Sequence, residues 1–379
     1  MTSKQRIKFG DICREVKITT KDPIADGYER YIGLEHLDSG SLKIKRWGII
    51  EEDNPSFTRV FKKGHILFGK RRPYLKKAAI AEFDGVCSGD IIVLESNQDE
   101  IVSTLLPFIL QKDLFWDHAI KTSSGSLSPR TKFTSLKAFE LTIPSRSEQV
   151  SVSNLLKSNL KNYALGMDAL DTLAVYRQKL IDSFFERFSS YPQLPLVDLI
   201  SIKNGYAYSG KNIGDEETDS VIVTPGNFHL GGGYNASKDR FYSGDVIRDF
   251  KLRGGDLIVN MTDLSKDGDT LGLPAFIPES SKKYLHNQRV GLVEFRSQEL
   301  KPSFLFMFMC STQFRRKIVA TSSGTTVRHT SVAKLLDFNL PIPPVELQIS
   351  ASNANKHLEE LKCNLQRREN IYRSIINTF

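Results

Sequence analysis

The sequence predicts an α+β fold of two tandem globular domains, each followed by a long α-helix. Three observations lead to this prediction: a length of 379 residues with 40% hydrophobic residues, an internal repeat, and two heptad patterns of equal span. A chain of this length can form two domains with separate cores. Pro192 and Pro195 mark the boundary between the halves, because proline cannot continue a helix. The predicted boundaries are 1–145 for the first domain, 146–190 for its helix, 191–344 for the second domain and 345–379 for the second helix.

The internal repeat is clearest in the segment that precedes each long helix. Residues 122–125, Thr-Ser-Ser-Gly, match residues 321–324 at a shift of 199, and the alignment continues without a gap to Pro144 and Pro343. It contains 10 identities over 23 positions, too many in one register for shared composition to explain. The repeat predicts two units with the same local structure.

Short apolar runs ahead of each long helix predict strands, and a longer amphipathic run predicts a helix. In the first half these are strands at Val60–Phe68 and Asp90–Leu94 and a helix at Leu105–Ile120. In the second half they are strands at Leu257–Val259 and Val290–Phe295 and a helix at Ser303–Ile318. The shared order predicts that each domain mixes helices and strands.

Each long helix carries apolar residues at alternating steps of four and three, the heptad pattern of a coiled coil, interrupted only by Arg177 and Arg368. At a rise of 1.5 Å per residue each seam is about 50 Å long, so we expect most of it to pack against another helix. The expected partner is the other helix of the same chain, and a homodimer is the alternative. The predicted interface residues are Leu156, Leu160, Met167, Leu170 and Ile181 in the first helix and Leu358, Leu361, Leu365 and Tyr372 in the second.

The most basic stretch of the sequence directly follows a predicted strand, at residues 70–77. Arginine can donate two hydrogen bonds to guanine, lysine neutralises phosphates, and tyrosine can donate to a phosphate or pack on a sugar. A solvated charged loop is the alternative interpretation. The residues that we predict to bind DNA here are Lys70, Arg71, Arg72, Tyr74, Lys76 and Lys77.

The corresponding loop of the second half is polar and acidic, so the two halves are predicted to prefer different DNA sequences. Its candidate base-reading residues are Asn260 and Thr262, with Lys266 nearby, and a flexible acidic turn is the alternative. The repeated Thr-Ser-Ser-Gly segments supply hydroxyl groups and adjacent cations for backbone phosphates, although the end of a helix explains the glycine equally well. The candidate phosphate-binding residues are Ser124, Arg130, Ser323, Arg328 and His329.

Several classes of site are not indicated by the sequence. The four cysteines are far apart and the histidines lack metal-ligand spacing, so no metal or cofactor is expected. Asn54–Phe57 is close to the Asn-Pro-Pro-aromatic segment of adenine methyltransferases but lacks the second proline, and no glycine-rich cofactor turn precedes it. We therefore assign no catalytic residue.

The overall charge and the apolar runs limit the class of protein further. A formal charge of +8 and a pI near 9.1 favour a polyanionic partner without identifying DNA. The N-terminus has no apolar signal core, and the longest apolar run, Phe304–Cys310, is too short to span a bilayer. These observations predict a soluble cytoplasmic protein.

The chain resembles the specificity subunit of type I restriction-modification systems over its whole length. The resemblance rests on two strands that begin at Gly64 and Gly255, on the two Thr-Ser-Ser-Gly segments, and on the Ile-Pro junctions that lead to Gln149 and Gln348. Each motif is weak alone, but their occurrence twice, in order, ahead of heptad helices is specific. Thr142 and Ser145 depart from the usual proline-rich junction.

The resemblance implies a non-catalytic subunit with two target recognition domains, each reading one part of a split double-stranded DNA site. It also implies an antiparallel coiled coil that sets the distance between the two domains. The implied partners are two modification subunits that methylate adenine, and a restriction subunit could join them. A stand-alone nucleic-acid enzyme and a coiled-coil scaffold that binds protein are the alternatives.

Overall fold

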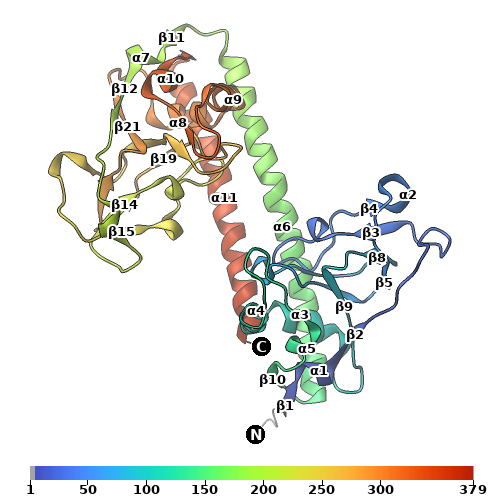
Figure 1. Ribbon diagram of the computed structural model, residues 1–379. Coiled ribbons are helices and arrows are strands. Elements are labelled where there is room, and N and C mark those ends of the chain that lie inside the picture. The colour runs from blue at the N-terminus through green and yellow to red at the C-terminus, as the bar shows by residue number, and fades with distance from the viewer. Residues whose placement is uncertain (1–4, 379) are drawn as a thin grey trace. The chain divides into compact units, whose positions relative to one another are not determined.

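The computed structural model describes residues 5–378 and divides into two compact units. Unit 1 comprises Met1–Leu170 and Asn364–Phe379, and unit 2 comprises Asp171–Cys363. Two long helices, α6 (Arg146–Phe188) and α11 (Val345–Thr378), contribute residues to both units, and both are labelled in Figure 1. The units are thus divided within the helices, whereas the sequence predicts boundaries at the helix ends.

Unit 1 contains two four-stranded sheets and one strand pair. The first sheet, in the order β2-β9-β6-β7, is antiparallel throughout, and the second, β4-β3-β8-β5, has one parallel pair, β3 with β8. The first sheet contains β2 (Cys13–Val16), β6 (Ile66–Gly69), β7 (Ala78–Ile80) and β9 (Ile91–Ser96). The second contains β3 (Arg30–Ile32), β4 (Gly48–Ile49), β5 (Arg59–Phe61) and β8 (Gly85–Cys87). The pair is β1 (Gln5–Lys8) with β10 (Glu140–Ile143).

Strand β9 reads as a continuous apolar run because it serves two cores. Ile91 and Val93 belong to the cluster that contains Phe61, whereas Ile92 and Leu94 belong to the cluster that contains Trp116. Successive side chains of a strand point to opposite faces, so the sheet is covered on both sides. A strand of this kind shows no alternation of polar and apolar residues.

The predicted strand Val60–Phe68 is two strands in two different sheets. β5 ends at Phe61 and β6 begins at Ile66, with Gly64 between them at a φ of +91°. The turn is closed by a hydrogen bond from the Lys62 N–H to the imidazole Nδ1 of His65, 3.0 Å away. Glycine adopts a positive φ without strain, so the chain can reverse here.

The predicted helix Leu105–Ile120 is also divided, into α3 (Leu106–Gln111) and α4 (Asp113–Lys121). Lys112 between them is extended, with φ −63° and ψ 137°. The second half has the same break, where Ser311 separates α8 (Pro302–Cys310) from α9 (Thr312–Thr321) and its hydroxyl accepts a hydrogen bond from the N–H of Phe314. A serine cap starts a new helix, and the apolar period alone did not reveal it.

Unit 2 repeats the sheet order of unit 1 at β12-β21-β17-β19 and adds a five-stranded sheet, β13-β15-β14-β20-β16. The first sheet contains β12 (Ile200–Asn204), β17 (Leu257–Asn260), β19 (Pro274–Phe276) and β21 (Val290–Phe295). The five-stranded sheet contains β13 (Ile213–Gly214), β14 (Ser220–Val223), β15 (Arg240–Tyr242), β16 (Lys251–Leu252) and β20 (Lys283–His286). Two pairs complete the strands: β11 (Gln193–Pro195) with β23 (Asn339–Pro341), and β18 (Thr262–Asp263) with β22 (Arg328–His329).

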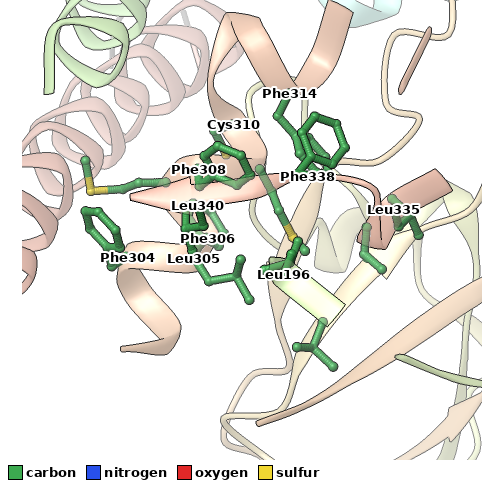
Figure 2. Packing of buried hydrophobic residues seen from close by; sticks show 14 of the residues in the cluster. Leu196, Phe304, Leu305, Phe306, Phe308, Cys310, Phe314, Leu335, Phe338 and Leu340 are labelled. Carbon is green, nitrogen blue, oxygen red and sulfur yellow. The ribbon is translucent and has the colours of Figure 1, made fainter. Parts of the chain in front are cut away.

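The core of unit 2 is rich in aromatic side chains from α8, as Figure 2 shows. Phe308 and Phe314 pack against Phe338, with the rings of Phe314 and Phe338 4.5 Å apart. Ile181 and Phe185 of α6 belong to the same cluster. Burial of each such side chain stabilises the fold by about 1.5–3 kcal/mol.

The remaining short helices of the two units are α1 (Phe9–Ile12), α2 (Ile50–Asp53), α5 (Phe133–Leu136), α7 (Leu196–Leu199) and α10 (Val332–Leu336).

Within unit 1, the first part of α6 packs near the last part of α11. The rings of Tyr163 and Tyr372 are stacked, with centroids 4.2 Å apart. Leu156 is buried, and Leu160 and Met167 are partly buried against the same core. The two tyrosine hydroxyls reach the domain, since Tyr163 donates to the carbonyl of Gly40 and Tyr372 donates to Gln111.

Within unit 2, the later part of α6 meets the first part of α11 through a buried arginine. The Arg177 side chain is only 8% exposed, and its Nε lies 2.8 Å from the Asn355 amide oxygen and 2.7 Å from the Glu359 carboxylate. Its NH1 donates to the carbonyl of Gly231, at 2.8 Å. The residue that interrupts the heptad pattern is therefore a polar contact between the two helices and a domain loop.

Burial along the predicted seams is uneven. Leu170, Leu358 and Leu365 are half-buried within their units, whereas Ile181 is fully buried. Leu361 is 49% exposed, which departs from the predicted seam. The helix ends that pack on a domain core are buried best, and the apolar period could not distinguish these ends from the middle.

The structure confirms the predicted mixture of helices and sheets in both halves. Within residues 5–378, no helix is both long and apolar enough to cross a membrane. The same residues contain no group of three or more histidine, cysteine, aspartate or glutamate side chains arranged to hold a metal ion.

Candidate nucleic-acid interface

In unit 1, three segments form one backbone frame around residue 70. The Lys70 N–H donates to the carbonyl of Asp90 at 2.9 Å, and the Lys70 carbonyl accepts from the N–H of Thr131 at 3.0 Å. Ser124 and Arg130 exchange two further backbone hydrogen bonds, of 3.0 and 2.9 Å. The basic loop, the turn before β9 and the Thr-Ser-Ser-Gly loop are thus joined edge to edge.

The side chains on this frame form a charged cluster around Asp90. Arg130 donates from Nε and NH2 to the two carboxylate oxygens of Asp90, at 2.8 and 3.3 Å. Arg71 lies 3.6 Å from the same carboxylate and donates from Nε to the Ser128 hydroxyl at 2.6 Å. The hydrogen bond from Arg130 holds the pKa of Asp90 below its ordinary value. One partly buried carboxylate therefore orients two partly exposed guanidinium groups.

Arg72 and Tyr74 extend from the same loop into solvent. Arg72 has a φ of +52°, and its N–H donates to the carbonyl of Pro129 at 2.7 Å. Its guanidinium has no polar partner among residues 5–378. Pro73 is buried and anchors the loop, while Tyr74 is 51% exposed. The loop therefore presents an exposed cation and an exposed aromatic ring two residues apart.

Lys76 and Lys77, which the sequence predicts to bind DNA, both contact other parts of the fold. Lys76 Nζ lies 2.7 Å from the Asp113 carboxylate, and this hydrogen bond is the largest cause that lowers the pKa of Asp113. Asp113 also accepts from the side chain of Asn377 in α11. Lys77 Nζ donates to the carbonyl of Leu34 at 2.8 Å. Both ammonium groups therefore have partners within the fold, which the sequence could not show.

The Thr-Ser-Ser-Gly segment combines the two roles considered for it. Thr122 caps α4 through a hydrogen bond from its hydroxyl to the carbonyl of His118, and Gly125 has a φ of +112°. The segment is therefore a helix end that continues into a turn. Ser124 and Arg130 are both exposed on that turn.

Unit 2 builds the same frame around residue 261. The Met261 N–H donates to the carbonyl of Arg289, and the Met261 carbonyl accepts from the N–H of Thr330, both at 3.0 Å. Ser323 and His329 exchange two backbone hydrogen bonds, of 3.0 and 2.8 Å. The bonds correspond one for one to those of unit 1.

Two predicted base-reading residues of unit 2 lie inside the domain. Asn260 is fully buried and donates from Nδ2 to the Thr270 hydroxyl at 2.9 Å. Thr262 is only 3% exposed, and its hydroxyl lies 3.1 Å from Nδ1 of His329. Neither side chain can reach a DNA groove in this arrangement. The structure therefore corrects the sequence prediction, which placed both on an exposed loop.

The other predicted residues of unit 2 lie at the surface. Lys266 and Ser323 are exposed, and so is His329. Arg328 braces the loop, since it donates to the carbonyl of Lys266 and to the Ser322 hydroxyl. Of the candidate cations here, Lys266 has no polar side-chain partner among the described residues.

Comparison with curated proteins shows which proteins the chain is similar to. No family model matches the chain. The EcoDI specificity subunit of a type I restriction enzyme from Escherichia coli is 29% identical over 140 residues, which cover 37% of this chain and 31% of that protein. The MjaVIII specificity subunit from Methanocaldococcus jannaschii is 21% identical over 393 residues, which cover 94% of this chain and 86% of that protein. The chain is similar to type I restriction enzyme specificity subunits.

Further matches extend this similarity. The EcoBI specificity subunit from Escherichia coli is 27% identical over 192 residues, so the matches span about a third of the length of both Escherichia coli proteins. The solved structure of a type I restriction-modification system S subunit from M. genitalium matches with a TM-score of 0.56 and 13% identity, over 99% of this chain and 96% of that one. A chain from a structural study of assembly and conformational transition of the type I R-M system has a TM-score of 0.50 and 15% identity, over 100% and 98%. The chain thus has the fold of a specificity subunit.

Two charged residues of the frames are not among the residues predicted from the sequence. Asp90 orients Arg71 and Arg130 in unit 1, and Arg289 occupies the equivalent place in unit 2. The Arg289 guanidinium is exposed and has no polar partner within residues 5–378. The repeat shift of 199 aligns Asp90 with Arg289 and would have found both residues.

Proposed function

We propose that the chain is the non-catalytic DNA-specificity subunit of a type I restriction-modification complex. Each unit reads one part of a bipartite DNA site, and the chain positions two adenine methyltransferase subunits, and a restriction subunit where one exists, in the cytoplasm. The observation that carries the proposal is the presence of one backbone frame in both units with different side chains on it. A common frame with different reading groups suits a protein that recognises two unlike half-sites, which are the two parts of the split DNA site.

The groups exposed on the two frames suit a polyanionic partner. Arg71, Arg72 and Arg130 gather on the surface of unit 1, and Tyr74 lies beside them. Arginine forks can bond guanine edges or phosphates, and additional cations make binding depend on salt. In unit 2, Lys266 and Ser323 offer phosphate contacts.

We also propose that α6 and α11 form an antiparallel coiled coil that separates the target recognition domains, with domain boundaries at 1–145 and 191–344. In unit 1, Tyr163 of α6 contacts Tyr372 of α11, and in unit 2, Arg177 of α6 contacts Asn355 of α11. Residue numbers increase along one helix as they decrease along the other, which supports antiparallel pairing within one chain. A rigid spacer of this kind fixes the gap between half-sites.

A methylation map tests the proposal directly. The chain is co-expressed with its modification subunit in a host that lacks adenine methylation, and methylated adenines are then mapped across the genome. We expect one split sequence motif that disappears when the chain is omitted. The purified chain alone should methylate no DNA. Methylation by the isolated chain, or a map that does not depend on the chain, would contradict the proposal.

A further inference from the structure

The matching backbone frames define three equivalent side-chain positions in the two units. The bonds around Lys70 in unit 1 correspond to those around Met261 in unit 2. The first position is the residue after the central one, Arg71 or Thr262. The second is the residue whose carbonyl accepts the N–H of the central residue, Asp90 or Arg289. The third position, on the Thr-Ser-Ser-Gly loop, is Arg130 or His329.

The correspondence is supported by residues that do not differ between the frames. Thr131 and Thr330 are both buried, and both hydroxyls lack a hydrogen-bond partner among the described residues. Gly125 and Gly324 both have a positive φ, of +112° and +92°. The supporting structure is the same, so the three differing side chains are not a by-product of a different backbone.

We infer that these two triplets, Arg71–Asp90–Arg130 in unit 1 and Thr262–Arg289–His329 in unit 2, determine which bases each unit recognises. The inference rests on the proposed function and names the residues that recognise the bases. In each triplet two side chains face solvent; Asp90 contacts both of them in unit 1, whereas Thr262 contacts only His329 in unit 2.

In unit 1 the positioning residue is Asp90 and the reading residues are the two arginines. Asp90 is 21% exposed, and its carboxylate lies within 3.6 Å of both guanidinium groups. A guanidinium carries five N–H donors, so the contacts with Asp90 and Ser128 leave donors on Arg71 and Arg130 for a ligand. Two arginine forks held at a fixed angle suit the O6 and N7 acceptors of guanine.

In unit 2 the place of Asp90 is taken by Arg289, the triplet has no acidic member, and Thr262 positions His329. Its buried hydroxyl contacts Nδ1 of His329, which fixes the orientation of the exposed imidazole ring. Arg289 replaces the acidic residue of unit 1 and is exposed, without a hydrogen bond or ion pair from its side chain to the described residues. A single free arginine beside a histidine presents fewer donors than two arginines do, so unit 2 should read a half-site with fewer guanine contacts.

Exchange of the triplets tests the inference. In the first variant Arg71→Thr, Asp90→Arg and Arg130→His are combined, so that unit 1 carries the residues of unit 2. The complex with the modification subunits is used to map methylated adenines. We expect a changed or degenerate sequence in one half of the motif and an unchanged sequence in the other. An unchanged motif at an unchanged methylation level would overturn the inference, although the wild-type map would still support the proposed function.

A single exposed substitution covers the case in which the triple variant does not fold. Arg289→Ala removes a side chain that has no polar contact in the described structure, and Arg316→Ala in α9 is a matched exposed control in the same unit. Affinity for a duplex with the mapped motif should fall about tenfold or more for Arg289→Ala, with reduced discrimination at one or two base pairs of a single half-site. Arg316→Ala should bind like the wild type. Equal losses for both variants, or none for Arg289→Ala, would overturn the assignment, whereas a wild-type chain that yields no motif would overturn the proposed function itself.

Discussion

Charged residues only a few positions apart in the basic loop have opposite roles, and their contacts distinguish them. Arg72 projects into solvent without a polar partner in the described structure, whereas Lys76 is paired with Asp113. Sequence alone gives both the same charge and the same loop. The contact partner therefore decides whether a cation is available to a ligand.

At this scale we predict that Arg72→Ala and Lys76→Ala separate binding from stability. Arg72→Ala should weaken binding to the first half-site by about 1–3 kcal/mol and leave the free energy of unfolding unchanged, because the side chain contacts only solvent. Lys76→Ala should lower the free energy of unfolding by at most about 1 kcal/mol, since its ion pair is partly exposed, and leave DNA affinity unchanged. Urea unfolding and fluorescence anisotropy measure the two quantities. The opposite pattern would return Lys76 to the DNA interface and remove Arg72 from it.

At the scale of the elements, a residue that interrupts the heptad pattern of a long helix makes a buried polar contact. Arg177 interrupts the heptad seam of α6, yet it is one of the most buried charged residues and joins α6, α11 and the Gly231 loop in unit 2. A polar residue in an apolar helix interface restricts the register in which the helices can pair.

We predict that Arg177→Ala destabilises unit 2 strongly. Its removal takes away the donor to the Asn355 amide oxygen, one donor to the Gly231 carbonyl and the charge partner of Glu359, at a cost of about 2–4 kcal/mol. Lys179→Ala, an exposed lysine two residues along the same helix, is the control and should change the free energy of unfolding by less than about 0.5 kcal/mol. Equal stability of the two variants in urea would show that the Arg177 contacts contribute nothing.

The sequence predicted the helices and strands whose patterns depend on residues close together in the chain. The repeat predicted two units with the same local structure, and the structure has equivalent hydrogen bonds at Lys70 and Met261. It could not predict that Asn260 is buried, because this depends on the bond with Thr270 across a turn. The helix break at Lys112 was missed for a similar reason, since an apolar period does not encode a single extended residue. Local propensity is thus informative about elements and much less so about which polar side chains they expose.

At the scale of the whole molecule, the proposed coiled coil makes the gap between half-sites a property of helix length. Each unit carries its own frame, so lengthening the helices should leave base recognition unaltered. The helices cross from one unit to the other after Leu170 in α6 and after Cys363 in α11. These are the natural positions for an insertion.

We predict that one heptad inserted at both positions widens the spacer of the DNA motif and preserves both half-sites. Seven residues add about 10 Å of helix, which is roughly three base pairs. The methylation map measures the spacer and the half-sites together. Insertion into α6 alone is the control, and it should lower stability because the two seams no longer match. A spacer of unchanged length in the double insertion would rule out the helices as the spacing element.

The division of the units within the helices also has a consequence during protein synthesis. Tyr372 completes the stack with Tyr163 in unit 1, although more than 190 residues separate Leu170 from Asn364, where the second part of unit 1 begins. At ribosomal rates this is a delay of roughly 10–40 s, in which unit 2 can fold while unit 1 still lacks its second helix segment. During that time the apolar face around Tyr163 is uncovered, so a chaperone that binds nascent chains would meet the first half of the protein for longer than the second.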